Sequence, residues 1–135
     1  MRYDPAMHVP LKALLLFLIV QVALGQHMNS PEGPCQKPAT TVETANCFDR
    51  VLKNADGNLQ HFYEKLKEKL PADDFSRLQV AQRLWLKYRD ANCAAEYNLY
   101  GGGTAGPVAH LACLEADTRA RIAELHTIYD WQLKK

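Results

Sequence analysis

The sequence has no excess of charge of either sign. Its 135 residues include 16 Lys and Arg and 15 Asp and Glu, for a formal net charge of +1. Two of the basic residues and one acidic residue precede residue 26, so residues 26–135 hold 14 of each. Nucleic-acid-binding chains typically carry a basic stripe, whereas charges of both signs alternate here, as in residues 64–69. The composition therefore favours neither nucleic acid nor an anionic membrane surface as a partner.

Motifs for metal, nucleotide or acid–base chemistry are also missing. Zinc sites typically use pairs such as C-x-x-C, but the four cysteines stand 12, 46 and 20 positions apart. No Lys follows the glycine run at 101–103, as a phosphate-binding loop would require. His61, His110 and His126 suit surface or capping roles, and no pair of nucleophile and base is recognisable. We therefore expect no catalytic residues, no bound metal and no cofactor.

A long apolar run occurs only near the N-terminus, at residues 13–23. Basic residues precede it, and a small-x-small motif follows just before Gln26. The run is shorter than the roughly 20 residues that a membrane span needs. We interpret residues 1–25 as a cleavable signal peptide, with translation starting at Met1 or Met7; an uncleaved anchor is the alternative. The mature chain is then expected to be periplasmic or secreted, without a stable membrane span.

All four cysteines fall in the part of the chain expected to be exported. They are Cys35, Cys47, Cys93 and Cys113. An oxidising compartment would pair them, so we expect two disulfides. Of the three possible connectivities we favour Cys35–Cys47 and Cys93–Cys113, because each closes a short segment; the other two stay open at this point.

Apolar residues recur at helical spacing over three long segments, without strand-like alternation. Residues 26–39 are rich in Pro and Gly and predict an extended arm tied down by Cys35. Thr40 begins a capping box for a first helix that lasts to about Leu70, and Gly57 is expected to weaken or bend its middle.

A second and a third helix are expected to form a hairpin. Asp73 or Asp74 can cap the second helix, which ends near Tyr97, and the third begins at Gly106-Pro107. The inward positions predicted for the second helix are Phe75, Leu78, Ala81, Trp85, Tyr88 and Ala95. The sequence thus predicts an all-α fold, an elongated bundle of three long helices with short connections, stapled by two disulfides.

The second helix also carries a W-x-x-Y-R-D-x-x-C segment. Its residues are Trp85, Tyr88, Arg89, Asp90 and Cys93, and a glycine loop and Cys113 follow. This combination resembles the LprI-type lysozyme inhibitor family over almost the whole mature chain. The resemblance implies an exported helical domain, here residues 40–135. It also implies lysozyme inhibition, because the member that gave the family its name inhibits lysozyme. It does not say which residues contact a partner.

We interpret the signature residues as mainly structural. Trp85 and Tyr88 are expected to fill the core, with ligand stacking as the alternative for both. Arg89, which precedes Asp90, is expected to lie along the indole of Trp85 or to pair with a carboxylate on another helix. An anion clamp is the alternative role for Arg89.

The loop around residues 97–105 is the better candidate for partner contact. Loops on a rigid scaffold commonly present recognition side chains, and Tyr97, Asn98 and Tyr100 suit that role; a plain helix connection is the alternative. We predict an exported protein-binding module, with lysozyme (a muramidase) as the implied partner. The alternatives are an accessory or structural protein of the envelope with another protein partner, or a small-ligand carrier. The balanced charge supplies no acidic surface to steer a basic enzyme.

Overall fold

The computed structural model describes residues 27–37 and 40–134, so the predicted signal peptide lies outside the described residues. The chain forms a short 3-10 helix, η1 (His27–Asn29), and three long α-helices. These are α2 (Thr41–Lys69), α3 (Ala72–Asn98) and α4 (Ala105–Leu133). No strand occurs among the described residues. The all-α prediction is confirmed.

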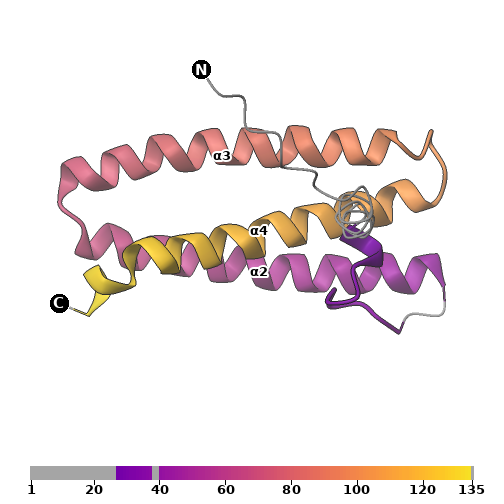
Figure 1. Cartoon of the computed structure of the whole chain (residues 1–135), viewed down its shortest axis with the longest axis horizontal. Coiled ribbons are helices and arrows are strands. Elements are labelled where there is room, and N and C mark those ends of the chain that lie inside the picture. Colours follow the sequence, from indigo (N-terminus) through magenta and orange to yellow (C-terminus); the bar gives the residue numbers. More distant parts are fainter. Residues whose placement is uncertain (1–26, 38–39, 135) are drawn as a thin grey trace, which may run out of the picture.

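The three helices lie side by side as an elongated bundle, with α4 between the other two (Figure 1). Their lengths of 29, 27 and 29 residues correspond to roughly 40 Å each. α4 packs along both α2 and α3, whereas α2 and α3 have few contacts with each other. None of the helices in the described ranges is long and apolar enough to cross a membrane.

The start of α2 has the predicted capping box. The backbone N–H of Glu43 donates to Thr40 Oγ1 over 3.2 Å, and the backbone N–H of Thr40 donates to Glu43 Oε2 over 3.0 Å. Two of the N–H groups that a helix start leaves without intrahelical acceptors are thereby satisfied. α2 then runs through Gly57 without a break to Lys69.

The starts of α3 and α4 differ from the sequence prediction. α3 begins at Ala72 after Pro71, so Asp73 and Asp74 lie in the first turn and neither is the N-cap. Their carboxylates still face the positive end of the helix dipole. α4 begins at Ala105, which makes Pro107 its third residue. Proline is tolerated there because the first N–H groups of a helix have no intrahelical acceptor.

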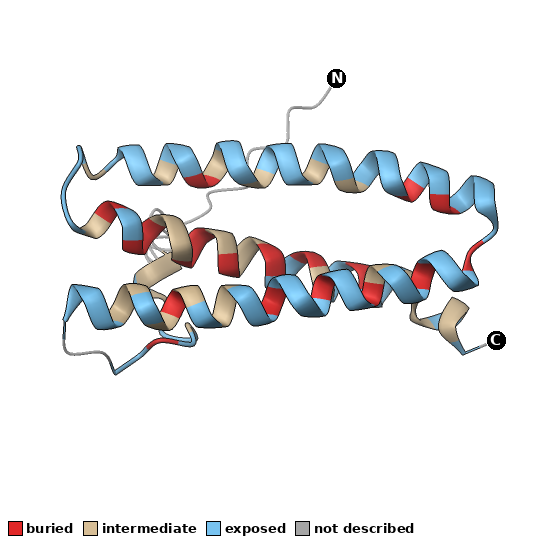
Figure 2. Ribbon diagram, turned by 180° about the vertical axis from the view of Figure 1, so that it is seen from behind, coloured by how far each residue is buried: buried red, intermediate tan, exposed pale blue. Residues whose placement is uncertain are grey.

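The apolar core lies around α4. One cluster joins the end of α2, the start of α3 and the second half of α4, and a smaller one joins the arm and α2 to the first half of α4. The buried residues of the larger cluster are Leu59, Phe62, Leu66, Leu70, Phe75, Leu78 and Leu125. Nine residues are buried on α4, five on α2 and three on α3. Figure 2 shows the corresponding exposure of α3 along its length.

This arrangement overturns part of the predicted inward face of α3. Phe75 and Leu78 are buried and Trp85 is half-buried against the larger core cluster. Ala81 and Ala95 are exposed, and Tyr88 is 62% exposed, so the prediction that Tyr88 fills the core is wrong. The physical reason is that α3 packs against α4 along only one side.

Both predicted disulfides are present, Cys35–Cys47 and Cys93–Cys113. The first ties the arm to α2, and the second ties α3 to α4 one to two turns from the loop that joins them. The arm departs from the predicted extended form, because it begins with η1, which packs against α4.

Candidate functional site

Arg89 links all three helices. Its Nη1 donates to Asp56 Oδ1 of α2 over 3.2 Å and to Thr118 Oγ1 of α4 over 3.0 Å. Its Nε and Nη2 donate to Asp90 Oδ1 over 3.2 and 3.1 Å. The Arg89 side chain is 14% exposed and Thr118 is fully buried. One guanidinium thus forms hydrogen bonds with polar groups on both neighbouring helices. These contacts give Arg89 a structural role.

Trp85 lies close to two guanidinium groups. The Arg89 Cζ atom is 5.2 Å from the centre of the Trp85 ring, and the Arg121 Cζ atom is 5.9 Å from it. Both distances lie within the range of cation–π attraction. Arg121 of α4 also donates through Nε to Gln82 Oε1 over 3.1 Å and through Nη1 to Glu124 Oε2 over 2.6 Å. The indole therefore holds α3 against α4.

Polar contacts continue toward the disulfide that joins the two helices. Asn92 Nδ2 donates to Asp117 Oδ2 over 3.3 Å, and His110 Nδ1 lies 3.1 Å from the backbone oxygen of Cys93. Cys93 and Cys113 are completely buried. One side of this part of α3 thus contacts α4 through a row of specific interactions, made by Gln82, Trp85, Arg89, Asn92 and Cys93.

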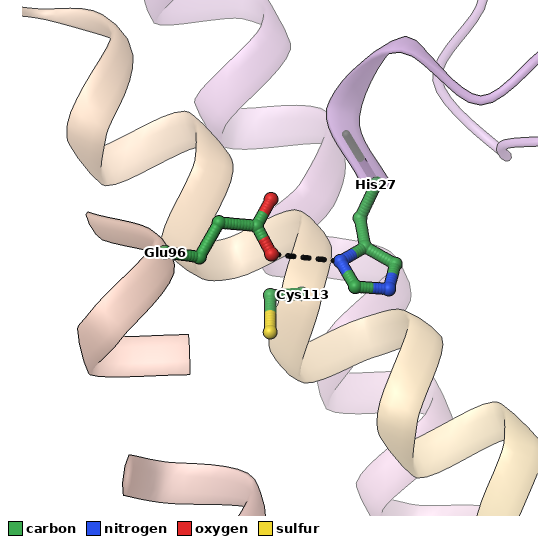
Figure 3. Close-up of side chains that lie close together, drawn as sticks. All are labelled: His27, Glu96 and Cys113. Atoms are coloured by element: carbon green, nitrogen blue, oxygen red, sulfur yellow. Dashed lines mark hydrogen bonds and ion pairs between the residues drawn. The ribbon is translucent and has the colours of Figure 1, made fainter. Parts of the chain in front are cut away.

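The side chains of His27 and Glu96 lie within ion-pair distance of each other beside this disulfide. Figure 3 shows the His27 ring pointing at the Glu96 carboxylate, with Cys113 next to them. The distance from His27 Nδ1 to Glu96 Oε2 is 2.8 Å. The other carboxylate oxygen, Oε1, is buried without a hydrogen-bond partner. His27 comes from η1 and Glu96 from α3, so the contact holds the N-terminal arm against the helical hairpin.

Two groups of side chains are close enough together to be considered as metal ligands. They are His27, Glu96 and Cys113, and Cys93, Cys113 and Asp117. In both groups the cysteines belong to the Cys93–Cys113 disulfide. Since a thiolate is the form that binds zinc, neither group offers a cysteine ligand in the oxidised protein.

The connection between α3 and α4 carries the predicted contact residues. Tyr97 and Asn98 form the last turn of α3, and Tyr100 lies in the loop that follows. Tyr97 is 37% exposed, its ring is in edge-to-face contact with His110, and it lies so near Gly106 that an added Cβ would be 3.1 Å from the ring. Tyr97 therefore belongs partly to the scaffold, whereas Asn98 is exposed and Tyr100 is half-buried.

The loop turns through its glycines. Gly101 and Gly102 have φ angles of +54° and +81°, in the left-handed region that favours glycine. The backbone N–H of Gly103 donates to the Tyr100 carbonyl over 2.8 Å, and that of Gly101 to the Asn98 carbonyl over 3.2 Å. The turn is tight and hydrogen-bonded, and its glycines are exposed at the end of the bundle.

Comparison with known proteins identifies the family. A family model described as lysozyme inhibitor LprI matches residues 34–125. The chain belongs to the LprI family. The matched range begins next to Cys35 and ends at Leu125, so both disulfides, the signature segment and the glycine loop of this LprI domain lie within it.

One curated relative is an uncharacterized protein of Rhizobium meliloti (strain 1021). It is 27% identical over 128 residues, which cover 85% of this chain and 92% of the relative. No solved structure gives a significant match to the chain. The LprI family supports a protein-binding role similar to that of a lysozyme inhibitor.

Sequence reasoning missed the partners of the signature residues on the other helices. Asp56 and Thr118 lie 33 and 29 positions from Arg89. One signal was present: Thr118 occupies a position in the apolar stripe of the third helix, between Leu114 and Ile122. A hydroxyl at an inward position requires a hydrogen-bond partner, which could have indicated a polar side chain opposite it.

Proposed function

We propose that this LprI-family protein is an exported inhibitor of lysozyme that acts by docking a rigid surface on the enzyme. The loop of residues 97–104 provides the central contact. This function requires no catalytic residue, since blocking access of the polysaccharide to the enzyme's cleft is sufficient. Family membership supports the class of partner, and the character of the loop supports the mode of docking.

The observation that carries the proposal is that the loop has no charged side chain and joins two helices that a disulfide holds together. Residues 97–109 include no Asp, Glu, Lys or Arg. Entering a cleft built for sugars would therefore bury no charge, which is the costly part of forming such an interface. The phenol of Tyr100 and the amide of Asn98 can occupy positions that sugar hydroxyls take.

The base of the loop is ordered before binding. The Cys93–Cys113 disulfide joins the two helices below it, and the Tyr97 ring is packed against Gly106 across the helix pair. A loop that already has its bound conformation loses less conformational entropy on association, so more of the contact energy appears as affinity.

The balanced charge determines how inhibition is expected to depend on ionic strength. Residues 26–135 hold 14 basic and 14 acidic side chains, so long-range attraction to a basic lysozyme is weak. Affinity must then come from short-range contacts, which salt screens little. We expect inhibition to change by less than about threefold between low and physiological ionic strength.

A turbidity assay tests the proposal. Purified residues 26–135 are titrated against several classes of lysozyme acting on suspended peptidoglycan, and inhibition is expected with at least one class. Tyr100→Ala should weaken that inhibition at least tenfold while the protein stays folded at the assay temperature, which its melting temperature verifies. A matched control is Val42→Ser, which changes a side chain 69% exposed on α2 and should leave inhibition intact.

The outcomes separate the two parts of the proposal. Absence of inhibition of every class at micromolar excess would remove lysozyme as the partner. Inhibition that Tyr100→Ala and Asn98→Ala both leave unchanged would keep the partner and exclude the loop as the contact.

A further inference from the structure

Two carboxylates lie beside the buried disulfide that joins α3 to α4. Asp117 Oδ2 is 3.8 Å from Cys93 Sγ, and a carboxylate oxygen of Glu96 lies within 4.8 Å of Cys113 Sγ. A disulfide sulfur carries no hydrogen, so neither contact is a hydrogen bond, and an uncharged disulfide does not attract a carboxylate. The disulfide therefore does not explain why both of its sulfurs have an acidic neighbour.

Glu96 is paired through only one of its two oxygens. Its Oε2 atom is 2.8 Å from His27 Nδ1, whereas its Oε1 atom is buried and, within the described part of the chain, has no hydrogen-bond partner. The Glu96 side chain is 14% exposed, and a buried carboxylate without full pairing is costly. Imidazole, carboxylate and cysteine sulfur, which meet here (Figure 3), are the donor types that zinc binds in proteins.

The donor atoms form two groups that share Cys113. His27, Glu96 and Cys113 make up one group, and Cys93, Cys113 and Asp117 make up the other; within each group the donor atoms all lie within 4.8 Å of one another. Bond lengths of about 2.0–2.3 Å to a tetrahedral zinc ion place its ligand atoms roughly 3.3–3.8 Å apart. Shifts of about 1 Å or less therefore bring either group to coordination distance.

We propose that reduction of the Cys93–Cys113 disulfide converts this cluster into a zinc site. The four ligands are the two cysteine thiolates, His27 Nδ1 and a carboxylate oxygen of Glu96. Cys93 completes the group of His27, Glu96 and Cys113, because its released sulfur still lies beside that of Cys113. Sequence spacing did not indicate this site, because His27 and Glu96 lie 69 positions apart.

Two neighbours support the site from outside the ligand set. Asn92 Nδ2 lies 3.6 Å from Cys113 Sγ and 3.3 Å from Asp117 Oδ2. A hydrogen-bond donor directed at a sulfur favours its thiolate form, which is the form that binds metal. Asp117 is held by the same amide, and its negative charge adds to the attraction for a divalent cation.

The disulfide and the zinc ion exclude each other. Bonded sulfurs lie about 2 Å apart, whereas two thiolates on one zinc ion lie roughly 3.8 Å apart. A dithiol reductant opens the bond: one of its thiolates attacks a cysteine sulfur, its second thiol releases the mixed disulfide, and two electrons pass from reductant to protein. The two cysteine thiols then lose two protons as they bind one zinc ion.

Zinc and the disulfide would hold overlapping parts of the fold. The disulfide joins α3 to α4. The zinc site joins the same two helices through Cys93, Glu96 and Cys113, and it also includes η1 through His27. Zinc would thus fix the base of the glycine loop when the disulfide is reduced.

Zinc binding by the reduced protein tests the site. The protein is expressed with its own leader, purified in the oxidised form, reduced with a water-soluble phosphine, and titrated with Zn²⁺ against a chromophoric chelator. One equivalent should bind to the reduced protein, and the oxidised protein should bind at least tenfold more weakly. Zn²⁺ should also raise the Tm of the reduced protein and leave that of the oxidised protein unchanged. A reduced protein that Zn²⁺ neither binds nor stabilises overturns the proposal, as does equal binding by both forms.

Substitutions identify the ligands. Cys113→Ser, Glu96→Gln and His27→Ala should each weaken zinc binding at least tenfold. Cys35→Ser, in the other disulfide, is the matched control and should leave binding unchanged. The Tm of oxidised Glu96→Gln and His27→Ala verifies that these variants fold, because both retain the Cys93–Cys113 disulfide. Loss of binding in Cys35→Ser, or a loss in Asp117→Asn as large as in Glu96→Gln, would overturn the ligand set. Since none of these measurements involves lysozyme, their results are independent of the proposed inhibition.

Discussion

Replacing Arg89 with Ala should destabilise the protein more than any exposed charge substitution on α3. The side chain is 14% exposed and reaches three elements of structure from one position. It donates to Thr118 and Asp56 on the two other helices and lies over the indole of Trp85. Truncation to Ala removes all of these interactions and the packing of the aliphatic stem.

The magnitude follows from the separate contacts. The charged hydrogen bond to the buried Thr118 hydroxyl contributes about 1.5–3 kcal/mol. The contact with Trp85 adds about 0.5–1 kcal/mol. The ion pair with Asp56, whose side chain is 49% exposed, adds less than about 1 kcal/mol because solvent screens it. These terms overlap, so we expect Arg89→Ala to lower the free energy of unfolding by about 2–4 kcal/mol, a fall in Tm of roughly 10–20 °C for a domain of this size.

Urea unfolding followed by helical circular dichroism measures this change. A double-mutant cycle with Thr118→Val isolates the contact across α3 and α4. If the two side chains stabilise each other directly, the double variant should lose about 1–2 kcal/mol less than the sum of the single variants. Lys87→Ala, an exposed position on the same helix, serves as the control and should change stability by less than about 0.5 kcal/mol.

Two results would refute this account of Arg89. If Arg89→Ala lowered the free energy of unfolding by less than about 0.5 kcal/mol, the hydrogen bonds of Arg89 would stabilise the fold little more than hydrogen bonds of the same groups to water. Additive losses in the cycle would mean that Arg89 and Thr118 act independently. A normal stability combined with lost lysozyme inhibition would instead assign Arg89 to the interface with a partner.

Three further predictions concern the scaffold. Replacing Cys93 and Cys113 together by Ala should lower the free energy of unfolding by about 3 kcal/mol, since the disulfide closes a segment with a sequence separation of 20; a change below 1 kcal/mol in denaturant unfolding would contradict this. Thr40→Ala should cost about 1 kcal/mol through loss of the capping box, and Thr40→Ser should retain most of it in the same measurement. Gly57→Ala, in open space within α2, should raise stability by about 0.5–1 kcal/mol, while Gly102→Ala should lower it because φ is +81° there; equal shifts in Tm would contradict the backbone argument.

Much of the fold could be predicted from the sequence. Local signals sufficed for the capping box at Thr40, the break after Leu70 and the glycine turn, because each depends on residues within a few positions. The disulfide pairing favoured from short segments, one of three that the sequence left open, is the one that the structure shows. The starts of α3 and α4 were less certain: Pro71 precedes one and Pro107 lies inside the other, and proline is compatible with several positions in a first helical turn.

The candidate site was predicted only in part. Tyr97, Asn98 and Tyr100 lie at the expected end of the bundle, but only the structure places the Tyr97 ring against Gly106. The partners of Arg89 and the contact between His27 and Glu96 join residues 29 to 69 positions apart. Helical periodicity records which residues share a face of one helix, and it contains no information about which side chain on another helix lies opposite.

By itself, the sequence determined three helices, their approximate ends, two disulfides and the family. The tertiary structure alone decided which apolar face of α3 is used. Both faces have helical periodicity, so hydrophobicity cannot choose between them. The packing of α4 against Cys93 and Trp85 decided it, and Tyr88, which lies about 60° around the helix from Trp85, is left in solvent. A burial pattern depends on the number and position of neighbouring helices, and these exist only after the chain has folded.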